Sequence, residues 1–167
     1  MQLRRAVPGD ERAVADVHVR AWQVGYRTLL PDDVLDGLRP DEWARRYTFA
    51  AGTGGPETTL AVDGGAVRGF ATIGPSPDPD VPGGGELYAL YVDPAWWGQG
   101  IGRGLIADAR EALERRGWTA AHLWVLHGNR RAERFYTGDG WSPDGSERRA
   151  QVHGIDVDER RFRRGLP

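Results

Sequence analysis

The stretch of sequence that decides the fold runs from Val92 to Gly104 and reads VDPAWWGQGIGRG. An apolar run ends at Val92, and a helical pattern from Gly100 to Arg116 follows. Glycines alternate with other residues at positions 98, 100, 102 and 104. Glycine allows a positive φ and a close backbone approach, and the free N–H groups at a helix start favour an anion. The sequence therefore predicts a strand, a glycine turn that can hold a phosphate or pyrophosphate, and a helix.

Other phosphate-binding motifs fit this turn poorly. A P-loop requires GK[ST], and the chain contains no lysine. The dinucleotide fingerprint GxGxxG is also absent. A relaxed GxGxxA at Gly102, Gly104 and Ala107 falls inside the expected helix, and the strand that ends at His127 supplies no acid for a ribose. Two interpretations of the turn stay open, an anion site of another kind or glycines needed only for packing.

A second segment follows the strand expected at residues 121–127. It runs from Asn129 to Tyr136 and reads NRRAERFY. Asn129 suits the cap of a helix, and Tyr136 follows about two helical turns later on the same face. The asparagine amide and the tyrosine hydroxyl can therefore address one ligand near the end of this strand.

Together the two segments resemble the GNAT superfamily of acyl-CoA-dependent N-acetyltransferases. The family motif Q/R-x-x-G-x-G/A is matched at residues 97–102, except that Trp97 stands where Gln or Arg is usual. The motif N-x-x-A-x-x-F-Y is matched at Asn129, Ala132, Phe135 and Tyr136. The resemblance covers essentially the whole chain and implies one domain, residues 1–167, of the α/β (α+β) class. Its twisted central sheet is expected to be mixed but mostly antiparallel, with about seven strands split near the middle and helices on both faces.

The resemblance also implies an activity. A GNAT enzyme moves the acetyl group of acetyl-CoA to a primary amine by direct attack in a ternary complex. A covalent acyl-enzyme is not expected, because the chain has no cysteine and no evident Ser-His-Asp arrangement. Two alternatives stay open: a sensor or regulatory module that binds CoA or acyl-CoA without turnover, and a nucleotide-binding enzyme.

Family members hold the CoA pyrophosphate on backbone amides of the glycine turn, here Gln99 to Arg103. Pantetheine lies beside the strand that ends at Val92, in a gap where two parallel strands splay apart, so Leu90 and Val92 would offer backbone partners. The cofactor-binding residues that the resemblance implies are Leu90, Val92, Trp97, Gly98, Gln99, Gly100, Ile101, Gly102, Arg103, Asn129 and Tyr136. Trp96 and Trp97 would shield pantetheine or face the partner of a homodimer, a common state among relatives.

Catalysis needs a base and an acid. A primary amine has a solution pKa near 10.4, so only about one molecule in a thousand is a free base at neutral pH. Glu86 matches a position where some family members carry a catalytic glutamate; the alternatives are a solvated strand-end carboxylate here, with His127 or water as the base. Tyr136 is the expected proton donor to the departing thiolate, and a purely buried aromatic is its alternative.

The acceptor side is expected to be aromatic. Trp22 and Tyr26 lie four residues apart on one helical face, and Tyr88 shares a strand with Glu86, although core packing is the preferred explanation for any one of them. The early helices carry five acids, Asp32, Asp33, Asp36, Asp41 and Glu42. These acids would attract a cationic amine or form a solvated helix face, and the second explanation is preferred.

The remaining elements follow from periodicity and turn residues. Helices are expected from about Asp10 to Tyr26, briefly after Pro31, and from Pro40 through Phe49. Strands are expected near Leu3, at 59–62 and 67–73 as a hairpin, at 86–92, and at 149–152 and 155–162 joined at His153 and Gly154. Residues 52–56 are expected as a break, 138–145 as a turn, and 74–85 as a mobile surface loop.

Composition limits the other classes. With 167 residues, 40% of them hydrophobic, the chain suits one soluble domain, and a net charge of -2 argues against nucleic acid as the main ligand. The four histidines lack metal-site spacing and cysteine is absent, so no metal is expected and a reducing cytoplasm fits. No apolar segment approaches the roughly 20 residues of a membrane span, and no signal-peptide core is present, so neither membrane insertion nor export is expected.

Overall fold

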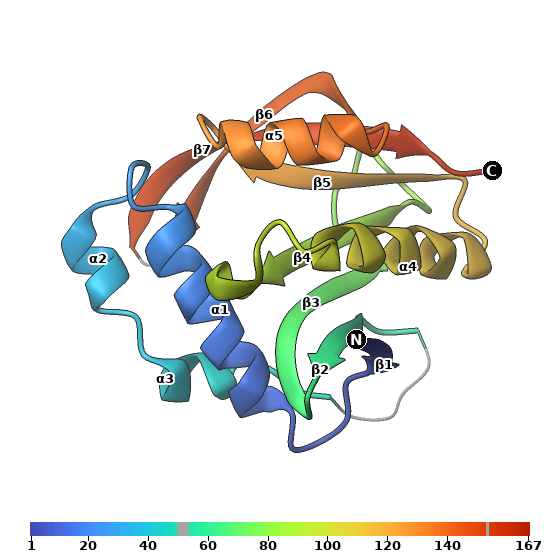
Figure 1. Cartoon of the computed structure of the whole chain (residues 1–167). Coiled ribbons are helices and arrows are strands. Elements are labelled where there is room, and N and C mark those ends of the chain that lie inside the picture. The colour runs from blue at the N-terminus through green and yellow to red at the C-terminus, as the bar shows by residue number, and fades with distance from the viewer. Residues whose placement is uncertain (50–53, 153) are drawn as a thin grey trace.

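Seven strands form one open sheet in the order β1-β2-β3-β4-β5-β7-β6 (Figure 1). The computed structural model describes residues 1–49, 54–152 and 154–167. The strands are β1 (Gln2–Arg5), β2 (Glu57–Asp63), β3 (Ala66–Pro75), β4 (Gly85–Val92), β5 (Ala120–Leu126), β6 (Ser142–Val152) and β7 (Ile155–Gly165). Every neighbouring pair is antiparallel except β4 and β5. The mixed, mostly antiparallel seven-stranded sheet predicted from the sequence is confirmed.

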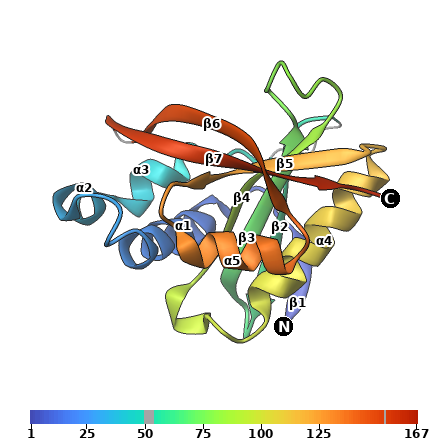
Figure 2. The ribbon, with the colours of Figure 1, turned by 90° about the horizontal axis from the view of Figure 1, so that it is seen from above.

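Helices cover both faces of this sheet, also as predicted. They are α1 (Glu11–Gly25), α2 (Asp32–Asp36), α3 (Pro40–Ala44), the 3-10 turn η1 (Pro94–Trp96), α4 (Ile101–Arg115) and α5 (Arg130–Gly138). Alternate residues of a strand point to opposite faces. Leu60 and Phe70 accordingly pack with α1, whereas Ala61 and Ala71 pack with α4. Figure 2 shows α1 on one side of β3 and β4 and α4 on the other.

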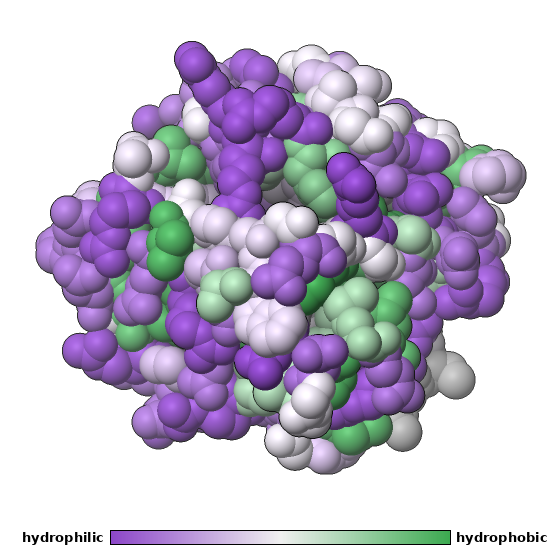
Figure 3. Space-filling view, in the orientation of Figure 1, coloured by the Kyte–Doolittle hydropathy of each residue, from purple (hydrophilic) through white to green (hydrophobic). Residues whose placement is uncertain are grey.

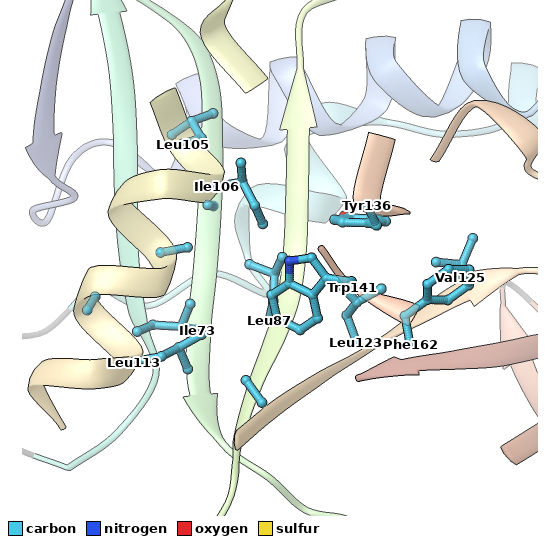
Figure 4. Close-up of a cluster of buried hydrophobic side chains, with 14 of the residues drawn as sticks. Ile73, Leu87, Leu105, Ile106, Leu113, Leu123, Val125, Tyr136, Trp141 and Phe162 are labelled. Atoms are coloured by element: carbon cyan, nitrogen blue, oxygen red, sulfur yellow. The ribbon is translucent and has the colours of Figure 1, made fainter. Parts of the chain in front are cut away.

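The larger core lies between the sheet and the helices α4 and α5. Leu105 and Leu113 of α4 and Trp141 after α5 are at most 1% exposed. Figure 4 shows these side chains converging with Leu123 and Phe162 of the sheet. Burying one large apolar side chain contributes about 1.5–3 kcal/mol. This core therefore fixes both motif-bearing helices against the middle of the sheet.

The sheet splits between β4 and β5. These parallel strands pair only at Gly85 with Ala121 and at Glu86 with His122. Beyond that point β5 continues along β7, and β4 continues along β3. The two middle strands therefore diverge after Glu86, which confirms the predicted split.

A β-bulge marks the place where β4 turns away. On β3, Thr72 and Ile73 are consecutive, but they face Ala89 and Leu87 of β4. Tyr88 is thus an extra residue without a partner on β3. A bulge bends its strand and redirects a side chain, and the Tyr88 ring lies against Gly74 with its hydroxyl bonded to the Pro75 carbonyl at the end of β3.

The third helix is shorter than predicted, because it ends at Ala44 rather than Phe49. The N–H of Tyr47 donates to the carbonyl of Ala44, three residues back (3.2 Å), a tight turn common at helix ends. Tyr47 then bonds to His18 and packs edge-on against Phe70. This tertiary contact overrides the helical pattern. Residues 52 and 53 of the predicted break lie outside the described residues.

The predicted turn at residues 138–145 is wrong in its second half, because β6 already begins at Ser142. Its pairing with β7 is irregular between Pro143 and Glu147, and Gly145 has a φ of 89°. An edge strand tolerates proline and bulges, since its outer side has no partner. Turn-forming residues therefore occur within a strand here. His153, in the predicted β6–β7 joint, lies outside the described residues.

The predicted mobile loop at residues 74–85 is anchored instead. Its ends belong to β3 and β4, and Val81 in its middle is 4% exposed. Asp78 and Asp80 both contact Arg161 of β7. Composition gave no sign of these long-range contacts, which tie the loop to the far half of the sheet.

The surface in the view of Figure 1 is dominated by hydrophilic side chains, with apolar ones in separate patches (Figure 3). Within the described ranges, no helix combines the length and the apolar character needed to cross a bilayer.

Candidate functional site

The divergence of β4 and β5 opens a cavity of about 640 Å³. Small-molecule sites commonly measure about 300–1,000 Å³. Its walls include Glu86 to Val92 of β4 and Leu123 to Leu126 of β5, and residues of the glycine turn, α1, α5 and β7 complete the lining. Both sequence motifs therefore face one space.

Backbone conformation requires glycine at two positions of the turn. Gly98 has a φ of 78°, and Gly100, the N-cap of α4, has a φ of 83°, a region that L side chains avoid. The N–H of Gly104 donates to the Gly100 carbonyl (3.1 Å). The three preceding amides, residues 101–103, thus have no acceptor inside the helix. They lie at the positive end of the helix dipole and suit an anion.

Gly102 has a packing role instead. A Cβ at this position would lie 3.3 Å from the ring of Phe135 on α5. Its absence lets α4 and α5 approach closely, which brings the turn beside the Asn129 to Tyr136 segment. Conformation and packing thus each explain part of the glycine pattern.

Trp97, the departure from the family motif, is held by two contacts. Its Nε1 donates to the carbonyl of Val92 (2.8 Å), so one acceptor expected to face pantetheine already has a donor. The guanidinium carbon of Arg131 lies 3.2 Å from the centre of the Trp97 ring. Arg131 lines the cavity, makes no ion pair with a carboxylate of the described residues, and has its pKa lowered by desolvation. Arg131 was not among the residues predicted from the sequence, because no local pattern reveals a stack between separate motifs.

Asn129 and Tyr136 both line the cavity. Asn129 caps α5 as predicted, because its Oδ1 accepts the N–H of Ala132 (3.1 Å). Tyr136 is 9% exposed, and burial raises the pKa of its hydroxyl. No described residue hydrogen-bonds to that hydroxyl. It is therefore protonated at neutral pH and available to a ligand.

Glu86 is buried in the cavity wall, with 6% of its surface exposed, rather than solvated. Its Oε2 lies 3.1 Å from Nε2 of His122, and the same nitrogen lies 3.2 Å from Oδ2 of Asp78. His122 is fully buried behind the carboxylate. The site therefore contains a carboxylate fixed by a histidine.

The expected acceptor residues Trp22, Tyr26 and Tyr88 also line the cavity. The rings of Trp22 and Tyr26 meet edge to face, with centres 4.9 Å apart. Burial raises the pKa of Tyr26 well above its usual value. Tyr88 is 39% exposed and donates to the Pro75 carbonyl. Two further aromatic lining residues, Tyr91 and Trp124, were missed by the sequence analysis.

The acids of the early helices lie outside this cavity. Arg27 pairs with Asp32 (3.2 Å) and Asp36 (2.8 Å), and Arg12 pairs with Asp41. These ion pairs are exposed and neutralise part of the charge. They agree with the preferred explanation of a solvated helix face.

Two predicted site residues are not part of the cavity lining. Gln99 is absent from it, and His127 lies at the surface with its Nε2 3.4 Å from Arg160. Within the described ranges, no three His, Asp or Glu side chains are grouped as metal ligands.

A split mixed sheet, a glycine turn with unpaired amides, and an asparagine-capped helix that carries a buried tyrosine together define a GNAT-type transferase. Residues 16–141 match the Acetyltransferase (GNAT) family. The chain belongs to this family.

Relatives agree with this assignment. The uncharacterized N-acetyltransferase YuaI of Bacillus subtilis is 33% identical over 128 residues, which cover 76% of this chain and 72% of that protein. Mycothiol acetyltransferase of Amycolatopsis mediterranei is 38% identical over 144 residues, which cover 82% of this chain but 44% of that protein.

Solved structures share the fold. A GCN5-related N-acetyltransferase from Rhodopseudomonas palustris has a TM-score of 0.76 at 19% identity, covering 99% of this chain and 95% of that one. The PaiA N-acetyltransferase of Thermoplasma acidophilum, solved in complex with coenzyme A, has a TM-score of 0.70 at 15% identity, covering 95% and 96%.

Proposed function

We propose that this chain transfers the acetyl group of acetyl-CoA to a primary amine by direct attack in a ternary complex. The observation that carries the proposal is the cavity between β4 and β5, because its walls hold Glu86, Tyr136 and the glycine turn together. Family membership supports acetyl-CoA as the donor.

The residues present fit coenzyme A chemically. The amides at the start of α4 bind pyrophosphate oxygens, and the guanidinium groups of Arg103 and Arg131 add positive charge to the same cavity. The backbone of Leu90 borders the gap, and the side-chain nitrogen of Asn129, which has no partner among the described residues, can donate to an amide carbonyl of the ligand. The proposed cofactor site is thus the set implied by the resemblance, with Arg131 added and Gln99 contributing at most its backbone.

Two residues of this chain handle protons. Bound acetyl-CoA supplies an activated thioester. Glu86 accepts a proton from the ammonium form of the substrate, so that the free amine can attack the carbonyl carbon. Tyr136, kept protonated by burial, donates its proton to the sulfur as the carbon–sulfur bond breaks. The nitrogen loses its second proton as the amide forms, and this proton restores the Tyr136 hydroxyl. The base lies on β4 and the acid on α5, and both side chains line the same cavity.

The acceptor amine occupies the aromatic part of the cavity. Trp22, Tyr26 and Tyr88 provide apolar surface there, and Trp124 and Tyr91 extend it. Aromatic faces also attract a cationic amine before it loses its proton. A compact amine with an apolar body suits this lining.

Thiol release from acetyl-CoA against a panel of amines tests the proposal. The chain has no cysteine, so a thiol-reactive dye sees no background from the protein. We expect release above the hydrolysis blank with at least one primary amine. No release with any amine, while CoA still raises the melting temperature, would instead favour the CoA-binding sensor.

A further inference from the structure

The cavity wall behind Glu86 contains a buried histidine between two carboxylates. Nε2 of His122 lies 3.1 Å from Glu86 and 3.2 Å from Asp78. Its Nδ1 is buried and has no hydrogen-bond partner among the described residues. Neither His122 nor Asp78 lines the cavity, so neither touches a ligand there directly, and His122 contacts the lining residue Glu86.

This geometry decides where the ring proton lies. A lone pair on Nε2 would face two carboxylate oxygens, and a single proton on Nδ1 would then be a buried donor without an acceptor. A proton on Nε2 satisfies both carboxylates at once. His122 therefore donates from Nε2 to Glu86 and Asp78.

Asp78 is itself fixed by the far half of the sheet. Its Oδ2 accepts the indole N–H of Trp124 (3.1 Å) and faces Arg161 (3.4 Å). Arg161 is 5% exposed and also bonds to Asp80 and Asp144. The second carboxylate at Nε2 is thus part of a built network rather than a mobile side chain.

We propose that His122 is a positioning residue for Glu86 and that Asp78 holds the proton of His122 on Nε2. The inference rests on the proposed role of Glu86 as the base. One carboxylate oxygen of Glu86 is bonded to His122, and no described residue donates to the other, Oε1. Holding Oε2 leaves Oε1 for the amine and limits the rotamers of Glu86. Well-oriented reacting groups react far faster than freely rotating ones.

Two substitutions of His122 test the positioning role. The amide nitrogen of glutamine reaches about as far from the backbone as Nε2, whereas that of asparagine reaches only as far as Nδ1. We expect His122→Asn to lower kcat about 10- to 100-fold with the KM for acetyl-CoA within about twofold, because the base loses its orientation. His122→Gln restores most of kcat. Asp78→Asn gives a smaller fall in kcat. Thermal unfolding of each variant controls for folding.

Equal kcat values for His122→Asn and the unaltered chain would overturn the inference while leaving the proposed function intact. Equal losses in the Asn and Gln variants would also overturn it, because a structural role does not distinguish the two amides. An unaltered chain that is inactive with every amine would reject the proposed function itself and, with it, the positioning role.

A measurement without turnover tests the hydrogen-bond geometry. With histidine labelled by nitrogen-15, NMR distinguishes the two ring nitrogens, and the four histidines make a simple spectrum. The signal lost in His122→Gln identifies this residue. We expect its Nε2 to carry a slowly exchanging proton in the unaltered chain. A proton on Nδ1 alone would overturn the proposal.

Discussion

The guanidinium carbon of Arg131 lies 3.2 Å from the centre of the Trp97 indole ring. Trp97 belongs to the glycine turn and Arg131 to the first turn of α5, so the stack joins the two family motifs across the mouth of the β4–β5 gap. Cation–π contact and the Val92 hydrogen bond fix both side chains. Arg131 thereby brings a positive charge close to the position where the family motif usually carries Gln or Arg.

Replacing Arg131 is expected to weaken the binding of acetyl-CoA. Arg131→Ala removes a positive charge from the cavity lining, and a loss of about 1.4 kcal/mol corresponds to a tenfold rise in Kd. We expect the Kd for CoA, measured by calorimetry, to rise about tenfold. Arg130→Ala is the matched control, because Arg130 is exposed and outside the cavity lining. Equal effects of the two substitutions would show that the stacked position has no special role.

Removing the Tyr136 hydroxyl is expected to slow turnover without weakening CoA binding. General acid catalysis typically contributes about 10²- to 10⁴-fold, so Tyr136→Phe should lower kcat by about 100-fold. The hydroxyl has no partner among the described residues, so the phenylalanine ring keeps the packing against Phe135 and Trp141. Steady-state kinetics and CoA-dependent melting measure the two effects. An unchanged kcat would remove Tyr136 from the mechanism.

Local patterns predicted the parts of the fold that local forces build. The hairpin at Asp63 to Gly65, the capped helix at Asn129 and the strand, turn and helix around Gly100 all follow from turn residues and periodicity, and the structure confirms them. Each of these features depends on neighbours in the sequence. The family motifs then located one end of the cavity.

Long-range contacts account for the features that the sequence did not reveal. Tyr47 leaves the predicted helix because it packs against Phe70, and the loop at residues 74–85 is anchored because the buried Arg161 bonds to Asp80. The contacts of Glu86 with His122 and of Trp97 with Arg131 likewise join segments that are distant in the chain. Periodicity carries no information about such pairs, since it describes only one element at a time.

Two glycines of the turn are expected to respond oppositely to alanine. Gly100 has a φ of 83°, and a Cβ in this conformation costs about 1–2 kcal/mol. Gly104 lies within α4, where an added Cβ would only touch Met1 at 3.7 Å, and alanine there gains about 0.5–1 kcal/mol over glycine. Urea unfolding should show Gly100→Ala destabilised and Gly104→Ala stabilised. A matching loss in both variants would contradict the assigned backbone roles.

The free energy of unfolding is expected to fall above pH 10. Burial raises the pKa values of Tyr26, Tyr47, Tyr91 and Tyr136 above the ordinary value of 10.0. In the unfolded chain these phenols lose their protons near pH 10, whereas the folded chain still keeps them. The unfolded state is therefore favoured progressively as the pH rises past 10, while the contribution of these groups is constant below that value.

Urea unfolding at pH 8, 9, 10 and 11, values chosen around the ordinary phenol pKa of about 10, measures the slope of the unfolding free energy against pH. Of these four tyrosines, only Tyr47 does not line the cavity. Tyr47→Phe removes its phenol and should make the fall shallower. A slope that Tyr47→Phe leaves unchanged would mean that Tyr47 titrates alike in the folded and unfolded chain.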